Sequence, residues 1–320
     1  MGSKGKSSES IQESISCINS YKLKQSLHFL RTGRSAVDMP GVSIYTGRTG
    51  CSVITRTYVM DHVLLPMLHL FNDGYLAAMP LFLPFLTEMF GITLGQVGFL
   101  GSLLNFSGIF LALPAGLAAA RYGATKILNY AVLLLCLAFL VLGFSSGFPV
   151  IVCAFVLASV AFGIFHPIAF AAVARQGQDG SLGRRLGTFA ATGDIGRIGF
   201  AATVTLLIAY SSWRTVSFLY AAMAAIVFSV CLAARRCTRG TVAGMEGKKR
   251  TLDMSLFRNH RFLLSTVASV MDSFANSSLF IFLPFLLTYR GIDVALMGAF
   301  TGVLFVNPLL HSVGKLLAKY

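Results

Sequence analysis

Charged side chains are scarce in this chain. They make up 12% of its 320 residues, and 12 residues are acidic, whereas a soluble domain carries about 25% charged residues. Hydrophobic residues make up 55% of the chain, and long stretches between the charged clusters carry almost no charge. So few polar side chains could not cover a succession of apolar helices in water, which excludes a soluble globular protein.

Signatures of catalysis, metal binding and secretion are also missing. The six cysteines are scattered without a CxxC pair, so neither a zinc site nor a disulfide framework is indicated, and we expect no cofactor and no metal. The N-terminus lacks the apolar core of a signal peptide. The stretch 143–147 matches the pattern GxSxG, but Ser145 would lie in a turn about 30 Å from His166 at 1.5 Å per helical residue. We therefore do not expect an enzyme.

Eight apolar stretches are long enough to cross a bilayer, which takes about 20 residues. They are 62–86, 96–120, 126–146, 148–174, 185–209, 213–235, 262–288 and 295–318. We predict an all-α integral membrane protein, a helical bundle with eight transmembrane helices.

The chain divides into four segments. Residues 1–59 are polar and predict a disordered cytoplasmic tail, with a true start at Met60 as the alternative. Residues 60–235 form a six-helix half, 236–261 a basic cytoplasmic linker, and 262–320 the first two helices of a second half.

The net charge of +14 would suggest nucleic acid in a soluble protein, but the positions of Lys and Arg indicate otherwise. Most of them lie before the first span, at the end of the eighth, or in the loops after the second, fourth and sixth spans, and these segments all share one side. Arg214 and Arg290 lie on the other side. This bias is typical of the cytoplasmic side. It predicts a multi-pass inner-membrane protein with both termini cytoplasmic and no nucleic-acid partner.

One segment occurs twice. Residues 81–98 and 281–298 share identical residues at an offset of 200, at Phe82, Leu83, Pro84, Phe85, Leu86, Gly91, Ile92 and Gly98 of the first copy. Both copies read as the end of an apolar helix, a glycine turn and the start of another helix. Two similar halves around a central site are typical of secondary transporters.

Ionisable residues inside the predicted spans cost about 2.5–3.5 kcal/mol each on insertion scales, so they indicate function. The candidates for transport and proton coupling are His69, Asn72 and Asp73 in the first span, His166 in the fourth, Asp194 and Arg197 in the fifth, and Asp272 and Asn276 in the seventh. These four spans are expected to line a polar interior, and the third and sixth to face lipid.

Asp73 is the strongest candidate for the proton carrier. No cation lies within one turn of it in the sequence, and an unpaired carboxylate in a low dielectric can hold a proton near neutral pH. His69 could share the proton; an interhelical hydrogen bond is the structural alternative. Asp194 and Arg197, three residues apart, can pair with each other. Arg197 would otherwise attract an anionic group of a substrate.

Two rows of glycines predict close helix packing. They are Gly95, Gly98 and Gly101 at the start of the second span, and Gly193, Gly196 and Gly199 within the fifth. Flexing of these helices during transport is the alternative interpretation.

The loop after the second span carries a further motif. Gly116, Arg121 and Gly123 match the pattern G-x-L-a-D-r-x-G-r-k, with Ala120 at the position of the aspartate. This gating-loop signature resembles that of the major facilitator superfamily, and the resemblance extends over about 60–320. It implies two six-helix halves that alternate around a central site. The missing aspartate puts the gating contact in doubt.

Two segments suggest a branch of that superfamily. HLFNDG at 69–74 and FGIFHPIAFAAVAR at 162–175 resemble the fosmidomycin-resistance-like branch of proton-driven drug exporters. The resemblance implies a proton-coupled carrier of a small molecule, with uptake and efflux both open. Its partners would be that substrate, protons and the lipid bilayer.

A full member of the superfamily has twelve helices, whereas eight are predicted here. We therefore expect a chain truncated after its eighth helix, or one that a second chain completes. The alternative function is a non-transporting membrane protein or scaffold.

Overall fold

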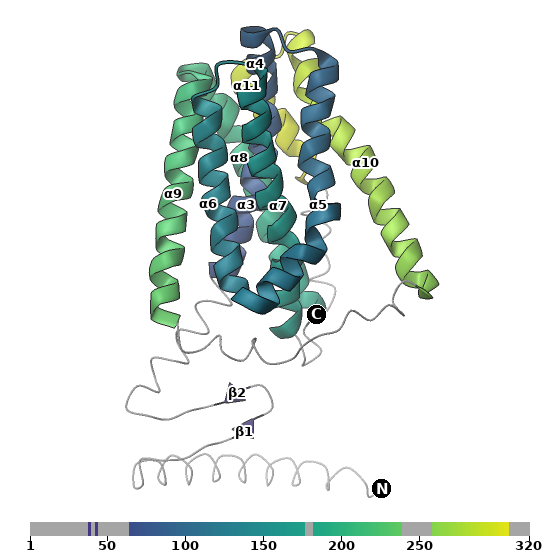
Figure 1. Ribbon diagram of the computed structural model, residues 1–320. Coiled ribbons are helices and arrows are strands. Elements are labelled where there is room, and N and C mark those ends of the chain that lie inside the picture. Colours follow the sequence, from purple (N-terminus) through teal and green to yellow (C-terminus); the bar gives the residue numbers. More distant parts are fainter. Residues whose placement is uncertain (1–37, 40–41, 44–63, 177–181, 239–257, 307–320) are drawn as a thin grey trace, which may run out of the picture. The chain divides into compact units, whose positions relative to one another are not determined.

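The computed structural model describes residues 38–39, 42–43, 64–176, 182–238 and 258–306 (Figure 1). The chain forms two units, Met1–Tyr58 and Val59–Tyr320. In the first unit, strands β1 (Asp38–Met39) and β2 (Val42–Ser43) pair antiparallel. The other residues of the predicted tail lie outside the described residues. In the second unit, the described elements are helices.

The first predicted span is divided into three helical pieces. They are α3 (Leu65–Ala78), the 3-10 helix η2 (Met79–Phe82) and α4 (Leu83–Phe90). Pro80 and Pro84 stand at the first turns of η2 and α4. Proline has no N–H for the helical ladder and its ring crowds the preceding turn, so the helix tightens locally to the 3-10 form. The continuous helix expected over 62–86 is corrected accordingly.

The remaining helices begin near the starts of the predicted spans, and all but the last, which ends at residue 303 of the expected 295–318, also end near the predicted ends. They are α5 (Leu94–Tyr122), α6 (Ala124–Gly143), α7 (Phe148–Gln176), α8 (Leu182–Tyr210), α9 (Trp213–Thr238), α10 (His260–Tyr289) and α11 (Val294–Val303). Within the described ranges, the five helices from α5 to α9 are long and apolar enough to cross a membrane. The chain is therefore a multi-pass membrane protein, and the total of eight spans stays a prediction.

The repeated segment forms the same turn in both copies. Gly91 ends α4 with φ of 64°, and Gly291 follows α10 with φ of 71°, a left-handed conformation that favours glycine. Two residues after each glycine, Thr93 caps α5 and Asp293 caps α11 through their side-chain oxygens. The copies differ before the turn, because α10 runs through Pro284 as one helix.

The helices pack as a bundle in which α3 and α11 both lie against α8 (Figure 1). In the same bundle, α7 packs against α5 and α6, and α6 against α9. Among the apolar side chains that α9 exposes are Leu219, Ile226 and Val230, which fits the expectation that the sixth span faces lipid. In Figure 1, α10 leans away from α5 toward its first residues.

The glycines of α8 allow its close approach to α3. A Cβ on Gly196 would overlap the backbone carbonyl of Leu70, and one on Gly193 would lie 2.6 Å from Cε1 of His69. Gly199 has open space around its Cβ position. The packing prediction therefore holds for two of these three glycines.

The glycine row of α5 faces α10. A Cβ on Gly101 would lie 2.5 Å from Cδ1 of Ile281, and one on Gly98 would be in ordinary contact with Phe282 at 3.6 Å. Gly95 would contact its own helix cap, Thr93, at 3.9 Å. Close helix packing therefore applies to the latter part of the row.

Candidate functional site

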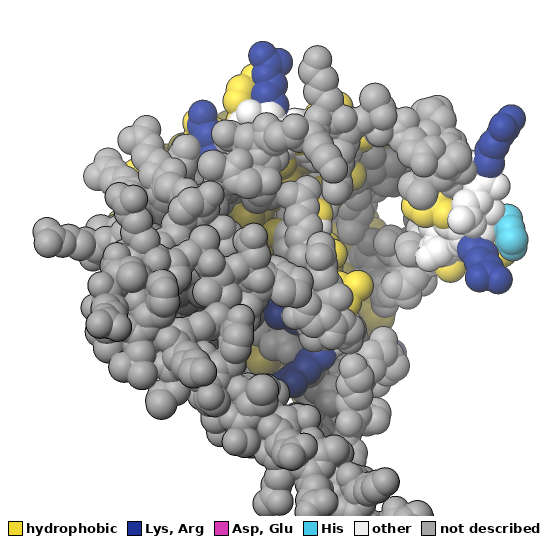
Figure 2. All heavy atoms as spheres, turned by 90° about the horizontal axis from the view of Figure 1, so that it is seen from below, with side chains coloured by type: hydrophobic (Ala, Val, Ile, Leu, Met, Phe, Trp, Pro, Cys, Tyr) yellow, Lys and Arg dark blue, Asp and Glu magenta, His cyan; other side chains and the backbone are white. Residues whose placement is uncertain are grey.

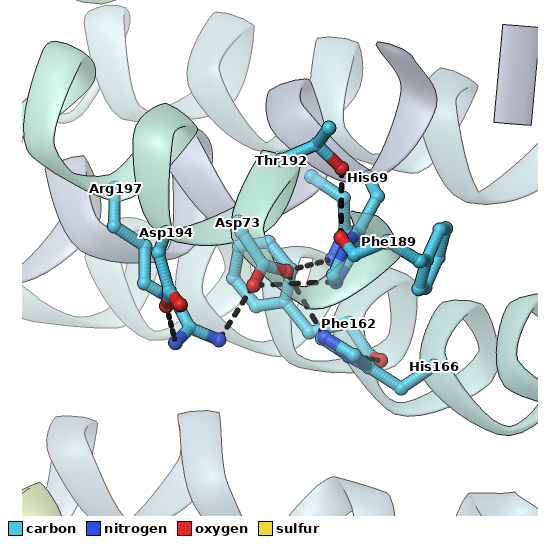
Figure 3. A network of polar contacts seen from close by, with 9 residues as sticks. His69, Asp73, Phe162, His166, Phe189, Thr192, Asp194 and Arg197 are labelled. Carbon is cyan, nitrogen blue, oxygen red and sulfur yellow. Dashed lines mark hydrogen bonds and ion pairs between the residues drawn. The ribbon is translucent and has the colours of Figure 1, made fainter. Parts of the chain in front are cut away.

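Asp73 of α3 lies at the centre of a buried polar network, with 1% of the residue exposed (Figure 3). Its Oδ2 is 2.5 Å from Nη2 of Arg197 and 3.4 Å from Nε2 of His69, and its Oδ1 is 3.0 Å from Nε2 of His166. The expectation of an unpaired carboxylate is therefore wrong. Arg197 and His166 come from α8 and α7, so spacing along the first span could not reveal them.

Both histidines present the same nitrogen to Asp73. Nδ1 of His69 lies 2.7 Å from the carbonyl oxygen of Phe189, and Nδ1 of His166 lies 3.3 Å from that of Phe162. A carbonyl oxygen can only accept, so each Nδ1 donates and carries a hydrogen. In a neutral imidazole, Nε2 then carries no hydrogen, and its lone pair faces a carboxylate oxygen. A hydrogen bond between them requires one additional proton.

The orientation of the His69 ring is fixed by aromatic packing. The ring stacks on Phe189 with centroids 3.9 Å apart and planes at 6°, and on Phe165 at 6.0 Å and 9°. The carbonyl of Phe189 also accepts a hydrogen bond from the Thr192 hydroxyl at 2.7 Å. Sequence reasoning missed these three residues, because nothing in their own sequence context relates them to His69.

Arg197 joins two carboxylates. Its Nη1 donates to Oδ1 of Asp194 at 3.1 Å, which is the pair predicted from their spacing, while its Nη2 contacts Asp73. With neutral imidazoles, the two carboxylates and one guanidinium leave the network with one net negative charge. A single proton on the histidine pair makes the network neutral, and neutrality is strongly favoured at low dielectric.

Two of the three basic groups, His166 and Arg197, form the accessible side of the network. The side chains of His166 and Arg197 are 29% and 27% exposed, whereas those of Asp73 and Asp194 are 1% and 6% exposed. Asn72 supports the buried side, where its Nδ2 donates to Oδ1 of Asp73 at 3.2 Å. An approaching solute would therefore meet the imidazole and the guanidinium before either carboxylate.

Three of these residues could also hold a metal ion. His69, Asp73 and His166 each offer one ligand atom, and these atoms all lie within 4.8 Å of one another. No metal was expected from the sequence, because the six cysteines are scattered without a CxxC pair. However, Arg197 already contacts Asp73, and a dication would leave the network with a net positive charge. The arrangement therefore fits a proton better.

The other predicted site residues lie elsewhere. Asp272 and Asn276 belong to α10 but fall outside the residues whose side chains are described. In the gating-loop signature, Gly123 joins α5 to α6 with φ of 90°, where a side chain would be strained, and Gly116 has open space around its Cβ position. Arg121 lies beside the Tyr122 ring.

The GxSxG stretch forms the turn between α6 and α7. Ser145 is 1% exposed, and its carbonyl accepts a hydrogen bond from Nη2 of Arg214 at 2.8 Å. The segment therefore joins two helix ends and does not present a serine to a substrate.

Long apolar helices around a buried network of ionisable side chains define a multi-pass membrane protein. The family model of the Major Facilitator Superfamily matches residues 67–320. The chain belongs to the major facilitator superfamily, whose members are secondary transporters of small molecules and not enzymes. A comparison with curated proteins finds no match.

Proposed function

We propose that the chain is a proton-coupled carrier of a small molecule, and that its coupling proton is held between His69, His166 and Asp73. One observation carries this proposal: both Nε2 atoms face the oxygens of one buried carboxylate, while both Nδ1 atoms face backbone carbonyls. Each imidazole can therefore gain a proton only at Nε2, where Asp73 would stabilise the imidazolium.

In this proposal the coupling proton is bound by the imidazoles of His69 and His166, and not by the carboxylate of Asp73. The sequence favoured Asp73 as the carrier because it lacked a cation nearby. With Arg197 at 2.5 Å, the negative charge of Asp73 is already stabilised, and the carboxylate serves as the counterion. His69 and His166 then share one proton, which alone neutralises the network.

Arg197 supplies the link to a substrate. An anionic group bound at the accessible side would contact Arg197 and His166, the most exposed members of the network. If it draws the guanidinium away from Asp73, the carboxylate is left to the two imidazoles, which favours their protonation. Substrate binding and proton binding would then be coupled, and the coupling is reciprocal by linkage.

We further propose that the lower end of the bundle in Figure 1 faces the cytoplasm of an inner membrane, with both termini on that side. The described charged residues at the loops and helix ends there are all basic, namely Arg121, Lys126, Arg184, Arg185, Arg258 and Arg261. The opposite end mixes both signs, with Glu88, Arg214, Arg290 and Asp293. A basic excess marks the cytoplasmic side. The similarity of 69–74 and 162–175 to the fosmidomycin-resistance-like branch supports proton coupling.

Inside-out membrane vesicles provide the test. The vesicles are acidified by respiration, a fluorescent weak base reports the pH gradient, and a panel of small anionic, neutral and cationic solutes is added. We expect at least one solute to dissipate the gradient in vesicles that contain the protein, and Asp73→Asn to abolish this effect. Glu88→Gln, the same chemical change at an exposed site, is the matched control.

The same assay separates the proposal from its alternative. If a solute dissipates the gradient to the same extent in vesicles with Asp73→Asn and in vesicles with Glu88→Gln, the network does not carry the coupling proton. If no solute has any effect, the non-transporting membrane protein, or a carrier that needs a second chain, becomes the better account.

A further inference from the structure

The turn between α5 and α6 holds two cations beside one aromatic ring. The ring centroid of Tyr122 is 5.3 Å from Cζ of Arg121 and 5.7 Å from Nζ of Lys126. The left-handed Gly123 makes the turn that brings these residues together. Tyr122 is 51% exposed, Arg121 is exposed and Lys126 is half-buried, so a partner can reach the ring and the two cations beside it.

The two cations lack an acidic neighbour within the described part of the chain, where the ion pairs involve other residues. The position at which the superfamily signature carries an aspartate is Ala120 in this chain. Two like charges held beside one ring repel each other unless an anion lies between or near them. The local electrostatics therefore favour an anionic partner.

The position of the turn identifies the kind of partner. It joins two long apolar helices that can cross a membrane, so it lies where those helices leave the hydrocarbon. An exposed tyrosine is typical of that interface. Figure 2, the view of this end, shows Lys and Arg side chains and no Asp or Glu side chain among the residues that it colours by type. A phosphate that lies permanently at this depth belongs to a lipid headgroup.

We propose that Arg121, Tyr122 and Lys126 form a binding site for the headgroup of an anionic phospholipid. The phosphodiester accepts hydrogen bonds from the guanidinium and the ammonium, and the Tyr122 ring keeps both cations in place. The lipid anion takes the place of the missing acid beside the gating loop. The site is independent of the proton network, which lies inside the bundle.

The test measures thermal unfolding of the purified full chain in detergent micelles during titration with phosphatidylglycerol or phosphatidylcholine. Juxtamembrane basic residues each strengthen binding to anionic lipid about fivefold. The Arg121→Gln/Lys126→Gln double variant should therefore need about 30-fold more phosphatidylglycerol for the half-maximal rise in melting temperature. Phosphatidylcholine should act equally on both proteins.

The matched control is Arg258→Gln/Arg261→Gln. It removes two charges that are also exposed at this end of the bundle but lie at the start of α10. We expect this variant to keep the response of the unmodified protein to phosphatidylglycerol. Equal losses in both double variants would mean that the general positive potential attracts the lipid, and would overturn a defined site. An unchanged response in Arg121→Gln/Lys126→Gln would overturn it as well.

Two further measurements test the identity of the anion and the role of the Tyr122 ring. Inorganic phosphate alone should not raise the melting temperature; if it reproduces the effect of phosphatidylglycerol, the ligand is a free anion and not a lipid. Tyr122→Phe should retain the lipid response, because a phenyl ring still supports the cations, whereas Tyr122→Leu should weaken it. Equal lipid responses of these two variants would show that the aromatic ring is not part of the site.

Discussion

Alanine substitutions in the glycine row of α8 test how the network is packed. A Cβ at Gly193 would lie 2.6 Å from Cε1 of His69 and 2.8 Å from Oδ2 of Asp73, whereas at Gly199 it would meet nothing within 4 Å. Alanine in place of glycine stabilises a helix by about 1 kcal/mol. Overpacking in a filled interior costs about 1–3 kcal/mol. Gly199→Ala should therefore stabilise the chain, and Gly193→Ala should leave it neutral or destabilise it by up to about 2 kcal/mol.

Gly196→Ala should be the most severe change in this series. Its Cβ would overlap the backbone carbonyl of Leu70, which cannot turn away as a side chain can, so α3 as a whole would have to move. We expect an overpacking cost of about 3 kcal/mol or more, which leaves a net loss of at least about 2 kcal/mol after the gain in helix propensity. Thermal unfolding in detergent should rank the proteins from most to least stable as Gly199→Ala, unmodified, Gly193→Ala and Gly196→Ala.

Transport separates the effect on the network from the effect on packing. Gly193→Ala displaces His69 and Asp73 directly, so it should reduce solute-dependent dissipation of the pH gradient even when the protein stays folded. Gly199→Ala should leave that activity unchanged. Equal stability and equal activity of these two variants would refute the close approach of α8 to α3 on which the site depends.

Three further changes have defined outcomes. Arg197→Gln removes the guanidinium beside Asp73 and should destabilise the chain by about 3 kcal/mol, because buried carboxylates lose their cation; thermal unfolding measures this loss, and an unchanged melting temperature would contradict the pairing. Gly123→Ala forces a side chain into a backbone conformation, with φ of 90° and ψ of 134°, that few residues other than glycine adopt, and should cost about 1–3 kcal/mol in the same assay. Tyr75→Phe removes the hydroxyl that donates to the Tyr220 carbonyl at 2.8 Å; the carbonyl keeps its bond within α9, so thermal unfolding should show the loss of one hydrogen bond, about 1 kcal/mol.

Much of the fold could be predicted from local patterns. The described bounds of α5 to α9 fall within a few residues of the apolar stretches. A long apolar run favours the lipid bilayer, and the backbone there must be helical to satisfy its own hydrogen bonds. The repeated glycine turn was also readable, since Gly91 and Gly291 need a conformation that few other residues adopt. The division of the first span was missed, because its two prolines act through the backbone and leave the apolar composition unchanged.

The candidate site was predicted only in part. Asp194 and Arg197 pair as expected, because three residues along one helix place them on the same side. Asp73 was expected to be unpaired, yet it has three basic neighbours, two of them on other helices. The Phe189 carbonyl that orients His69 is 120 residues away in the chain, a distance over which no sequence spacing carries information.

The amino-acid sequence by itself determined the solvent, the helices, the family and the set of ionisable residues placed within the membrane. The solvent and the helices follow from composition and from the lengths of the apolar runs, whereas the family follows from the resemblance of short motifs such as Gly116, Arg121 and Gly123. The tertiary structure alone decided which charges neutralise one another and which nitrogen of each histidine faces Asp73. Those outcomes depend on how closely α3, α7 and α8 approach one another and how each is rotated about its axis. Between α3 and α8, the missing side chains of Gly193 and Gly196 allow the close approach.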